Sequence, residues 1–99
     1  MKIPINGLHK ALESRIRLGI MSALAVNTTL DFNALKEYLS VTDGNLASHL
    51  KGLEKEQFIT VEKSFIDRKP NTRYSMTTTG RQAFSDHLKA LEEIIRQSN

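Results

Sequence analysis

One stretch of the sequence, residues 42–55, combines small polar side chains with lysines at helical spacing. Leu46, Leu50 and Leu53 recur at i, i+4 and i+7, which places them on one stripe of an α-helix. Such a helix would carry polar, small or basic residues on its other side: Gly44, Asn45, Ser48, Lys51 and Lys55. A face of this kind can approach the DNA major groove closely and offer hydrogen-bond donors and acceptors there, so we predict DNA contacts by these residues and by Thr42 just before them. An ordinary amphipathic surface helix has the same pattern, so this window alone leaves both interpretations open.

The segment just before this helix predicts how it is held. Asp31 has the side chain of an N-cap for a helix over residues 32–39, and Thr42 has that of an N-cap for the helix that follows. Ser40 and Val41 leave only a tight connection between the two. Two short helices joined in this way form a helix-turn-helix, which we place at about residues 32–55.

Further upstream, apolar residues step mostly by four from residue 5 to about residue 25. Ser14 interrupts this stripe as a possible N-cap, so we expect a short first helix and a longer second one meeting near residues 13–14. Residues 29–31 could then form a very short strand. The segment therefore predicts helices that support the helix-turn-helix.

Downstream, the apolar period changes to two, which is typical of a strand. Ile59, Val61 and Phe65 alternate with polar residues, and residues 73–76 offer a second strand. Residues 66–72 between them are rich in turn formers and bases, so we predict a β-hairpin at about residues 58–76 whose tip has no apolar residue to bury. The charges of this hairpin could serve only solubility. The hairpin directly follows a helix-turn-helix, however, which favours contacts with DNA by four of its cations: Lys63, Arg68, Lys69 and Arg73.

A last helix is predicted at about residues 78–97, capped by one of the threonines at 77–79. Apolar residues recur along it at spacings of four, three and four, as in a short coiled-coil seam. This stripe could pack on the same subunit, but the preceding elements already account for the core of the domain. We therefore predict a homodimer interface formed by Phe84, Leu88, Leu91, Ile94 and Ile95.

Composition sets limits on function. The 99 residues are enough for one domain, taken as 1–99, with 39% apolar and 25% charged residues. The net charge of +3 permits a polyanionic partner without requiring one. The absence of cysteine excludes disulfides and thiolate metal sites, and no long apolar run predicts a membrane span. We therefore expect an intracellular, cytoplasmic protein without membrane contact.

Three histidines are scattered through the chain without cysteines beside them, and we predict no metal site and no cofactor. We expect His87 to lie on the surface and His49, beside the leucine stripe, to be half-buried and hydrogen-bonded. No nucleophile–base pair, glycine-rich phosphate loop or paired carboxylates with supporting context are present, so an enzyme is not expected.

Three stretches together resemble the winged helix-turn-helix regulators of the MarR/ArsR-like group: residues 14–21 (SRIRLGIM), 39–54 (LSVTDGNLASHLKGLE) and 68–80 (RKPNTRYSMTTTG). The resemblance implies a mainly α fold with a small β-hairpin, the wing, and an additional C-terminal dimerisation helix. It further implies a homodimeric transcription regulator, a repressor, on a pseudo-palindromic double-stranded DNA site. Asp43 departs from this pattern by placing a carboxylate near expected phosphates, and the resemblance names no effector. A winged helix that binds only other proteins remains the alternative.

Overall fold

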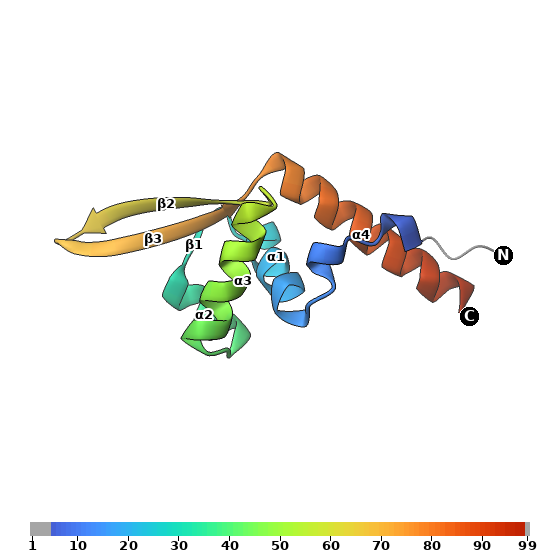
Figure 1. Ribbon diagram of the computed structural model, residues 1–99, viewed down its shortest axis with the longest axis horizontal. Helices are drawn as coiled ribbons and strands as arrows, with labels where there is room; N and C mark the ends of the chain where they lie inside the picture. Colours follow the sequence, from blue (N-terminus) through green and yellow to red (C-terminus); the bar gives the residue numbers. More distant parts are fainter. Residues whose placement is uncertain (1–4, 99) are drawn as a thin grey trace.

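Four α-helices and three strands follow one another in residues 5–98, the part of the chain that this computed structural model describes (Figure 1). Two 3-10 turns, η1 (Ile5–Gly7) and η2 (Lys10–Leu12), precede α1 (Arg15–Val26). The remaining elements are, in order, β1 (Leu30–Asp31), α2 (Phe32–Leu39), α3 (Asp43–Lys55), β2 (Ile59–Ile66), β3 (Lys69–Met76) and α4 (Thr78–Gln97). The predicted fold class, mainly α with a small β-hairpin and a C-terminal helix, is confirmed. Within residues 5–98, no helix combines the length and apolarity needed to span a bilayer.

Side-chain caps begin all four α-helices. Ser14 Oγ accepts the backbone N–H groups of Ile16 and Arg17, and the Asp31 carboxylate accepts that of Ala34 at 2.8 Å. Thr42 starts α3 in the same way, and among the three candidate threonines it is Thr77 that starts α4. Each cap satisfies an N–H that the helix itself leaves without a partner. These caps were predicted at Ser14, Asp31 and Thr42 from residue type alone.

The strands form one antiparallel sheet in the order β1-β3-β2. The short strand expected at residues 29–31 is β1, where Leu30 pairs with Tyr74. The hairpin turn is shorter than predicted, because only Asp67 and Arg68 lie between the strands. Both have positive φ, 50° and 66°, as in the two-residue turns that match strand twist. The turn lacks the glycine that usually signals this geometry, so the predicted loop over residues 66–72 was too long.

The core lies where α1 meets α2, α3 and the base of the sheet. Its centre is formed by side chains with no more than 1% of their surface exposed: Leu12, Ile20, Met21, Leu24, Leu35, Leu46 and Leu53. Burying each of these contributes roughly 1.5–3 kcal/mol relative to exposure. The hairpin and the far end of α4 project from this core in opposite directions (Figure 1).

The start of α4 is fixed against the end of α3 and the start of β2. Thr77 donates its backbone N–H to the Phe58 carbonyl at 3.0 Å and its hydroxyl to the Gln57 carbonyl at 2.7 Å. Gly80 then passes so close to the Phe58 carbonyl that a Cβ at this position would collide with it. The direction in which α4 leaves the core therefore depends on this contact.

The N-terminal segment is tied to α4 through two histidines. His87 is buried, with 4% of its surface exposed, and its Nδ1 accepts the backbone N–H of His9 at 3.0 Å. His9 in turn caps η2, because its own Nδ1 accepts the N–H of Ala11 at 3.1 Å, while its ring meets the Phe58 ring edge-on at 4.8 Å. The expectation that His87 lies on the surface is wrong, because the N-terminal turns, distant in sequence, cover it.

Burial lowers the pKa of His87, and the neighbouring His9 lowers this pKa further, while Glu13 opposes the change. Below the usual histidine pKa of about 6.5, the unfolded chain therefore binds a proton that the native state takes up less readily. We predict that the free energy of unfolding falls as the pH drops from about 7 through about 6.5 and below. Urea unfolding at a series of pH values would measure this slope.

His87→Asn is the matched variant, because its amide oxygen can accept the His9 N–H but cannot titrate. The variant is expected to lose part of the acid sensitivity; His49, whose pKa is also lowered, retains the remainder. An unchanged pH dependence in His87→Asn would contradict the assignment.

Candidate nucleic-acid interface

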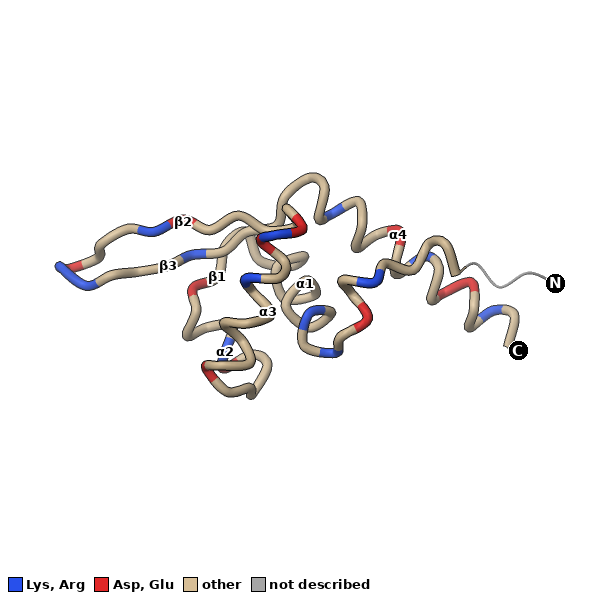
Figure 2. Tube along the Cα trace, viewed as in Figure 1, with Lys and Arg blue, Asp and Glu red and all other residues tan. Residues whose placement is uncertain are grey.

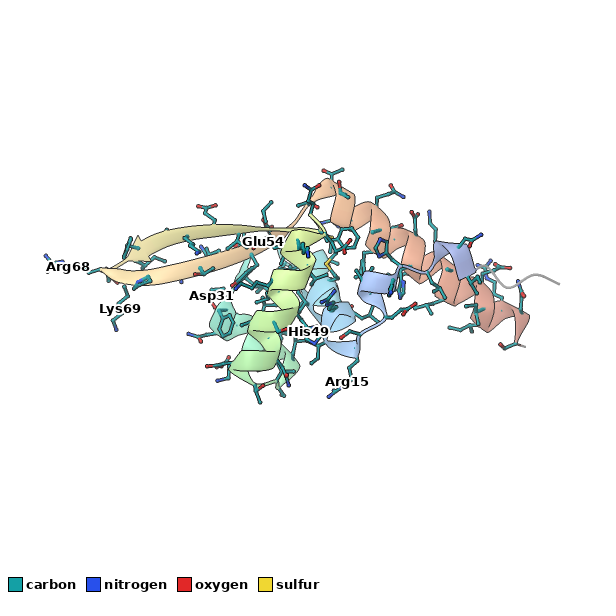
Figure 3. The ribbon with its side chains drawn as sticks, viewed as in Figure 1. Arg15, Asp31, His49, Glu54, Arg68 and Lys69 are labelled. Atoms are coloured by element: carbon teal, nitrogen blue, oxygen red, sulfur yellow. The ribbon has the colours of Figure 1, made fainter. Side chains whose placement is uncertain are left out.

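Helix α3 presents the polar face that its leucine spacing predicts. Leu46, Leu50 and Leu53 are buried in the core, which turns the opposite side of the helix to solvent. The predicted contact residues on that side are all exposed: Gly44, Asn45, Ser48, Lys51 and Lys55. No large apolar side chain is exposed on α3, and in Figure 3 the helix lies at the front of the molecule. The exposed face is therefore small and hydrogen-bonding near its start and basic toward its end.

The start of α3 explains how an acidic residue is accommodated on this surface. Asp43 forms an ion pair with Lys36 of α2, with 2.7 Å between Nζ and the carboxylate. An exposed pair of this kind adds little to stability, but it offsets the negative charge. Thr42 is exposed, and its hydroxyl accepts the Asn45 N–H at 3.2 Å, so this hydroxyl shapes the helix start.

A groove of about 790 Å³ separates α3 from the hairpin. Lys51 reaches it from the helix and Lys63 from β2, so cations line both walls. Glu54 lines it too, near Tyr74, whose pKa is raised by burial and further by this carboxylate. Among residues 5–98, the charged residues that line the groove are therefore two cations and one carboxylate.

The remaining cations of the hairpin point in different directions. Arg68 and Lys69 project at its tip, far from the core (Figure 3). Arg73 pairs across the sheet with Glu62 on one side and Asp31 on the other. Because cross-strand partners share a face, these two carboxylates offset the charge of Arg73. Lys63, Arg68 and Lys69 are thus better placed than Arg73 to meet a polyanion.

Arg15 and Arg17 add a basic region that the sequence analysis did not single out. Both lie in the first turn of α1, where the helix dipole disfavours positive charge. Cations at such a position do not stabilise the helix, so a role in binding is the simpler explanation. Two arginines directly after the predicted N-cap Ser14 are the sequence signal that could have identified this region. Figure 2 shows basic residues at this end of α1 beside α3. The basic region lies on the side of α3 away from the hairpin.

Arg17 also holds His49 in a defined state. Its Nε donates to His49 Nδ1 at 3.1 Å, and its guanidinium lies over Gly52, where a Cβ would collide with it. Partial burial lowers the pKa of His49, and the charge of Arg17 lowers this pKa further. Because Nδ1 accepts, the neutral imidazole carries its proton on Nε2. The predicted half-buried, hydrogen-bonded His49 is confirmed.

The predicted dimer residues on α4 have different environments. Phe84 is part of this chain's own core, whereas Leu91 and Ile94 are half-buried. Leu88 and Ile95 have 42% and 62% of their surface exposed. A groove of about 810 Å³ runs between the N-terminal turns and α4, but it is lined by other residues of α4 and not by this stripe. The apolar surface available to a partner is thus narrower than predicted.

Comparisons with known proteins agree on one fold. A family model described as a winged helix DNA-binding domain matches residues 16–95. An uncharacterized protein of Methanocaldococcus jannaschii is 39% identical over 79 residues, covering 80% of this chain and 86% of that protein. A transcriptional regulator homologue from Pyrococcus horikoshii aligns with a TM-score of 0.84 at 30% identity, over 90% of this chain and 88% of that one. A mutant MarR from E. coli shares the fold at a TM-score of 0.77 and 16% identity, over 90% of this chain and 68% of that one.

Gly44 offers a way to separate folding from binding. A Cβ at Gly44 would meet nothing within 4 Å. We predict that Gly44→Ala leaves the free energy of unfolding unchanged or raises it by up to about 1 kcal/mol, since alanine is the better helix former. The added methyl should weaken DNA binding by about tenfold if this face enters the major groove.

Urea unfolding and fluorescence titration of a DNA duplex would measure the two effects. Gly80→Ala is the contrasting variant, because its Cβ would collide with the Phe58 carbonyl. It should lower the free energy of unfolding by about 1–3 kcal/mol. Unchanged DNA affinity in Gly44→Ala would show that the start of α3 does not approach the bases.

Proposed function

The chain belongs to the family of winged helix DNA-binding domains, and we propose that it is a sequence-specific regulator that binds double-stranded DNA as a homodimer. The family match, together with the structural likeness, confirms the resemblance predicted from the sequence. Both place the chain among transcription regulators and not among enzymes. A regulator must reach its DNA, so the proposal includes a cytoplasmic location.

One observation carries the proposal: the exposed polar face of α3 lies between two basic regions. The groove cations Lys51 and Lys63 lie on one side of this face. On the other side lie Arg15, which Figure 3 labels, and Arg17, whose guanidinium contacts α3. A helix seated in a major groove has a phosphate backbone on each side of it. The arrangement therefore supports insertion of α3, with both backbones held by cations.

Within this geometry, the residues have separate roles. We assign base-edge contacts to Asn45, Ser48 and Lys51, and close approach to Gly44. Backbone contacts are assigned to the remaining predicted residues and to the two arginines of α1: Thr42, Lys55, Lys63, Arg68, Lys69, Arg73, Arg15 and Arg17. Among these, Arg73 contributes least, because Glu62 and Asp31 offset its charge. Base contacts select a sequence, whereas phosphate contacts fix register and supply affinity.

The alternative of a module that binds only proteins has less support. Such a module would require an exposed apolar patch on α3, and α3 has none among its large side chains. The exposed apolar residues of α4 instead fit a second copy of this chain, as do Leu91 and Ile94 beside them. A dimer bound across a promoter would exclude other proteins from that DNA, which is why we propose repression.

The dimer can be tested together with the symmetry of its DNA site. We predict that Ile95→Glu halves the mass measured by sedimentation, because a charge buried in an apolar interface is strongly disfavoured. DNA selected from a random pool by the wild type should contain an inverted repeat with half-sites about 34 Å apart. The variant should select one half-site.

Val26→Glu is the matched control, because Val26 is an apolar residue on α1 with 81% of its surface exposed. This control should keep the wild-type mass and DNA site. A wild-type protein that sediments as a monomer, or a selected site without symmetry, would refute the dimer.

The wing cations can be tested by salt dependence. Binding of a cation to a phosphate releases counterions, so Arg68→Ala with Lys69→Ala should reduce the slope of log affinity against log salt by about 0.9 for each phosphate no longer neutralised. The double variant should weaken binding to specific and nonspecific duplexes about equally. Its free energy of unfolding should stay within about 0.5 kcal/mol of the wild-type value, since exposed charges contribute little.

Lys10→Ala with Lys89→Ala removes the same net charge from exposed positions outside the proposed interface. This control should leave the salt slope unchanged. If both double variants change the slope equally, overall charge and not the wing determines binding.

A further inference from the structure

The end of the hairpin carries exposed apolar residues, contrary to the prediction that its tip has none to bury. Phe65 has 76% of its surface exposed and Ile66 has 50%. Phe65 pairs with Pro70 across the hairpin, one pair inward from the turn-flanking pair of Ile66 and Lys69. An aromatic ring exposed this far from the core adds little burial to the fold, so a partner that covered it would gain apolar contact.

The strand register places Phe65 on a particular face of the hairpin. Val61 and Lys63 line the groove beside α3, as do their cross-strand partners Tyr74 and Thr72. Since side chains alternate between faces, Phe65 and Pro70 continue this same face toward the tip. Ile66 and Lys69 lie on the other face.

From this arrangement we infer that Phe65 and Pro70 form an apolar wedge that enters the DNA minor groove and bends the duplex. The inference rests on the proposed function, since it requires α3 to occupy the adjacent major groove. Phe65 follows Lys63 by two residues on one face, a step of about 6.8 Å along the strand. The minor groove is about 6 Å wide. A phosphate held by Lys63 would therefore bring Phe65 to the sugars and base edges of that groove.

The charges around the wedge favour DNA over other apolar partners. Lys63 lies on the same face, and Arg68 and Lys69 lie at the tip, against the single carboxylate of Asp67. Two copies of this tip would repel each other, whereas phosphates on either side of a minor groove complement it. Apolar side chains, proline and phenylalanine among them, enter minor grooves by partly unstacking one base step.

The backbone of the tip suits insertion. Proline at residue 70 has no N–H to donate, and in a hairpin closed by a two-residue turn the second pair is a non-hydrogen-bonded one. Pro70 occupies that pair, so its missing donor removes no ladder bond. Its fixed φ also stiffens the strand opposite Phe65. The backbone opposite Phe65 is thus restricted at Pro70 before it meets DNA.

The wedge predicts sequence preference at a position that α3 does not touch. Pyrimidine–purine steps such as TA and CA unstack most easily, so one of them should recur in selected DNA at the place where the wing lies. The duplex should bend by roughly 20–90° on binding, the range produced by inserted side chains.

Energy transfer between dyes at the ends of a duplex carrying the selected site measures the bend, and titration in the same assay measures affinity. We expect Phe65→Ala to reduce the bend and to weaken binding on the order of tenfold, because no ring would then pack against the unstacked bases. Phe65→Leu, which keeps an apolar side chain, should restore most of both. Ile66→Ala is the matched control on the opposite face of the hairpin and should change neither.

The outcomes separate the wedge from the proposed function. A wild-type protein that binds no duplex overturns both proposals. If the wild type binds the duplex in a salt-dependent way but does not bend it, the wedge alone is overturned. The same holds if Phe65→Ala bends the duplex as much as the wild type does. Equal decreases in DNA affinity with Phe65→Ala and Ile66→Ala would also overturn the wedge, because the proposal places only the Phe65 face of the hairpin against DNA. A change in the mass of the free protein with Phe65→Ala would make the tip a contact between copies, which also overturns the wedge.

Discussion

Burial of three leucines on α3 is the constraint on which the rest of the structure depends. A helix can rotate about its axis until its apolar stripe is covered, and complete burial of Leu46 and Leu53 leaves one orientation. That orientation decides which residues face outward, so the polar face of α3 follows from the core and not from any contact of its own. A polar residue in place of Leu50 would disturb packing and the presentation of Ser48 together.

Local features were predictable from the sequence because they depend on neighbouring residues. The caps at Ser14, Asp31 and Thr42 each involve a side chain and an N–H two or three residues away. The hairpin turn was missed because Asp67 and Arg68 adopt positive φ without a glycine. The burial of His87 was missed for another reason. Its hydrogen-bond partner, His9, lies 78 residues away, and no periodicity reports such a contact.

Charged residues could be assigned a role from the sequence only where several cations lie close together along the chain. The wing cations were predicted as DNA contacts because they cluster in the sequence. Arg15 and Arg17 were missed because they lie in a helix assigned to the core, although their place at the positive end of the α1 dipole is unfavourable. Asp43 was taken as a departure, and the structure explains it through the nearby Lys36. Charge at a surface is therefore interpretable only with its neighbours in space.

The hairpin illustrates how one strand can serve two purposes along its length. Near the core, Ile59 is buried and Tyr74 packs against the core cluster, so this end is fixed by apolar contacts. Farther out the same face carries Lys63 and then Phe65, beyond the reach of the core. The alternation that buries one end necessarily keeps these residues on the α3 side. An apolar ring at the outer end thus follows the register of the inner end, and a partner that covers it approaches the hairpin from the α3 side.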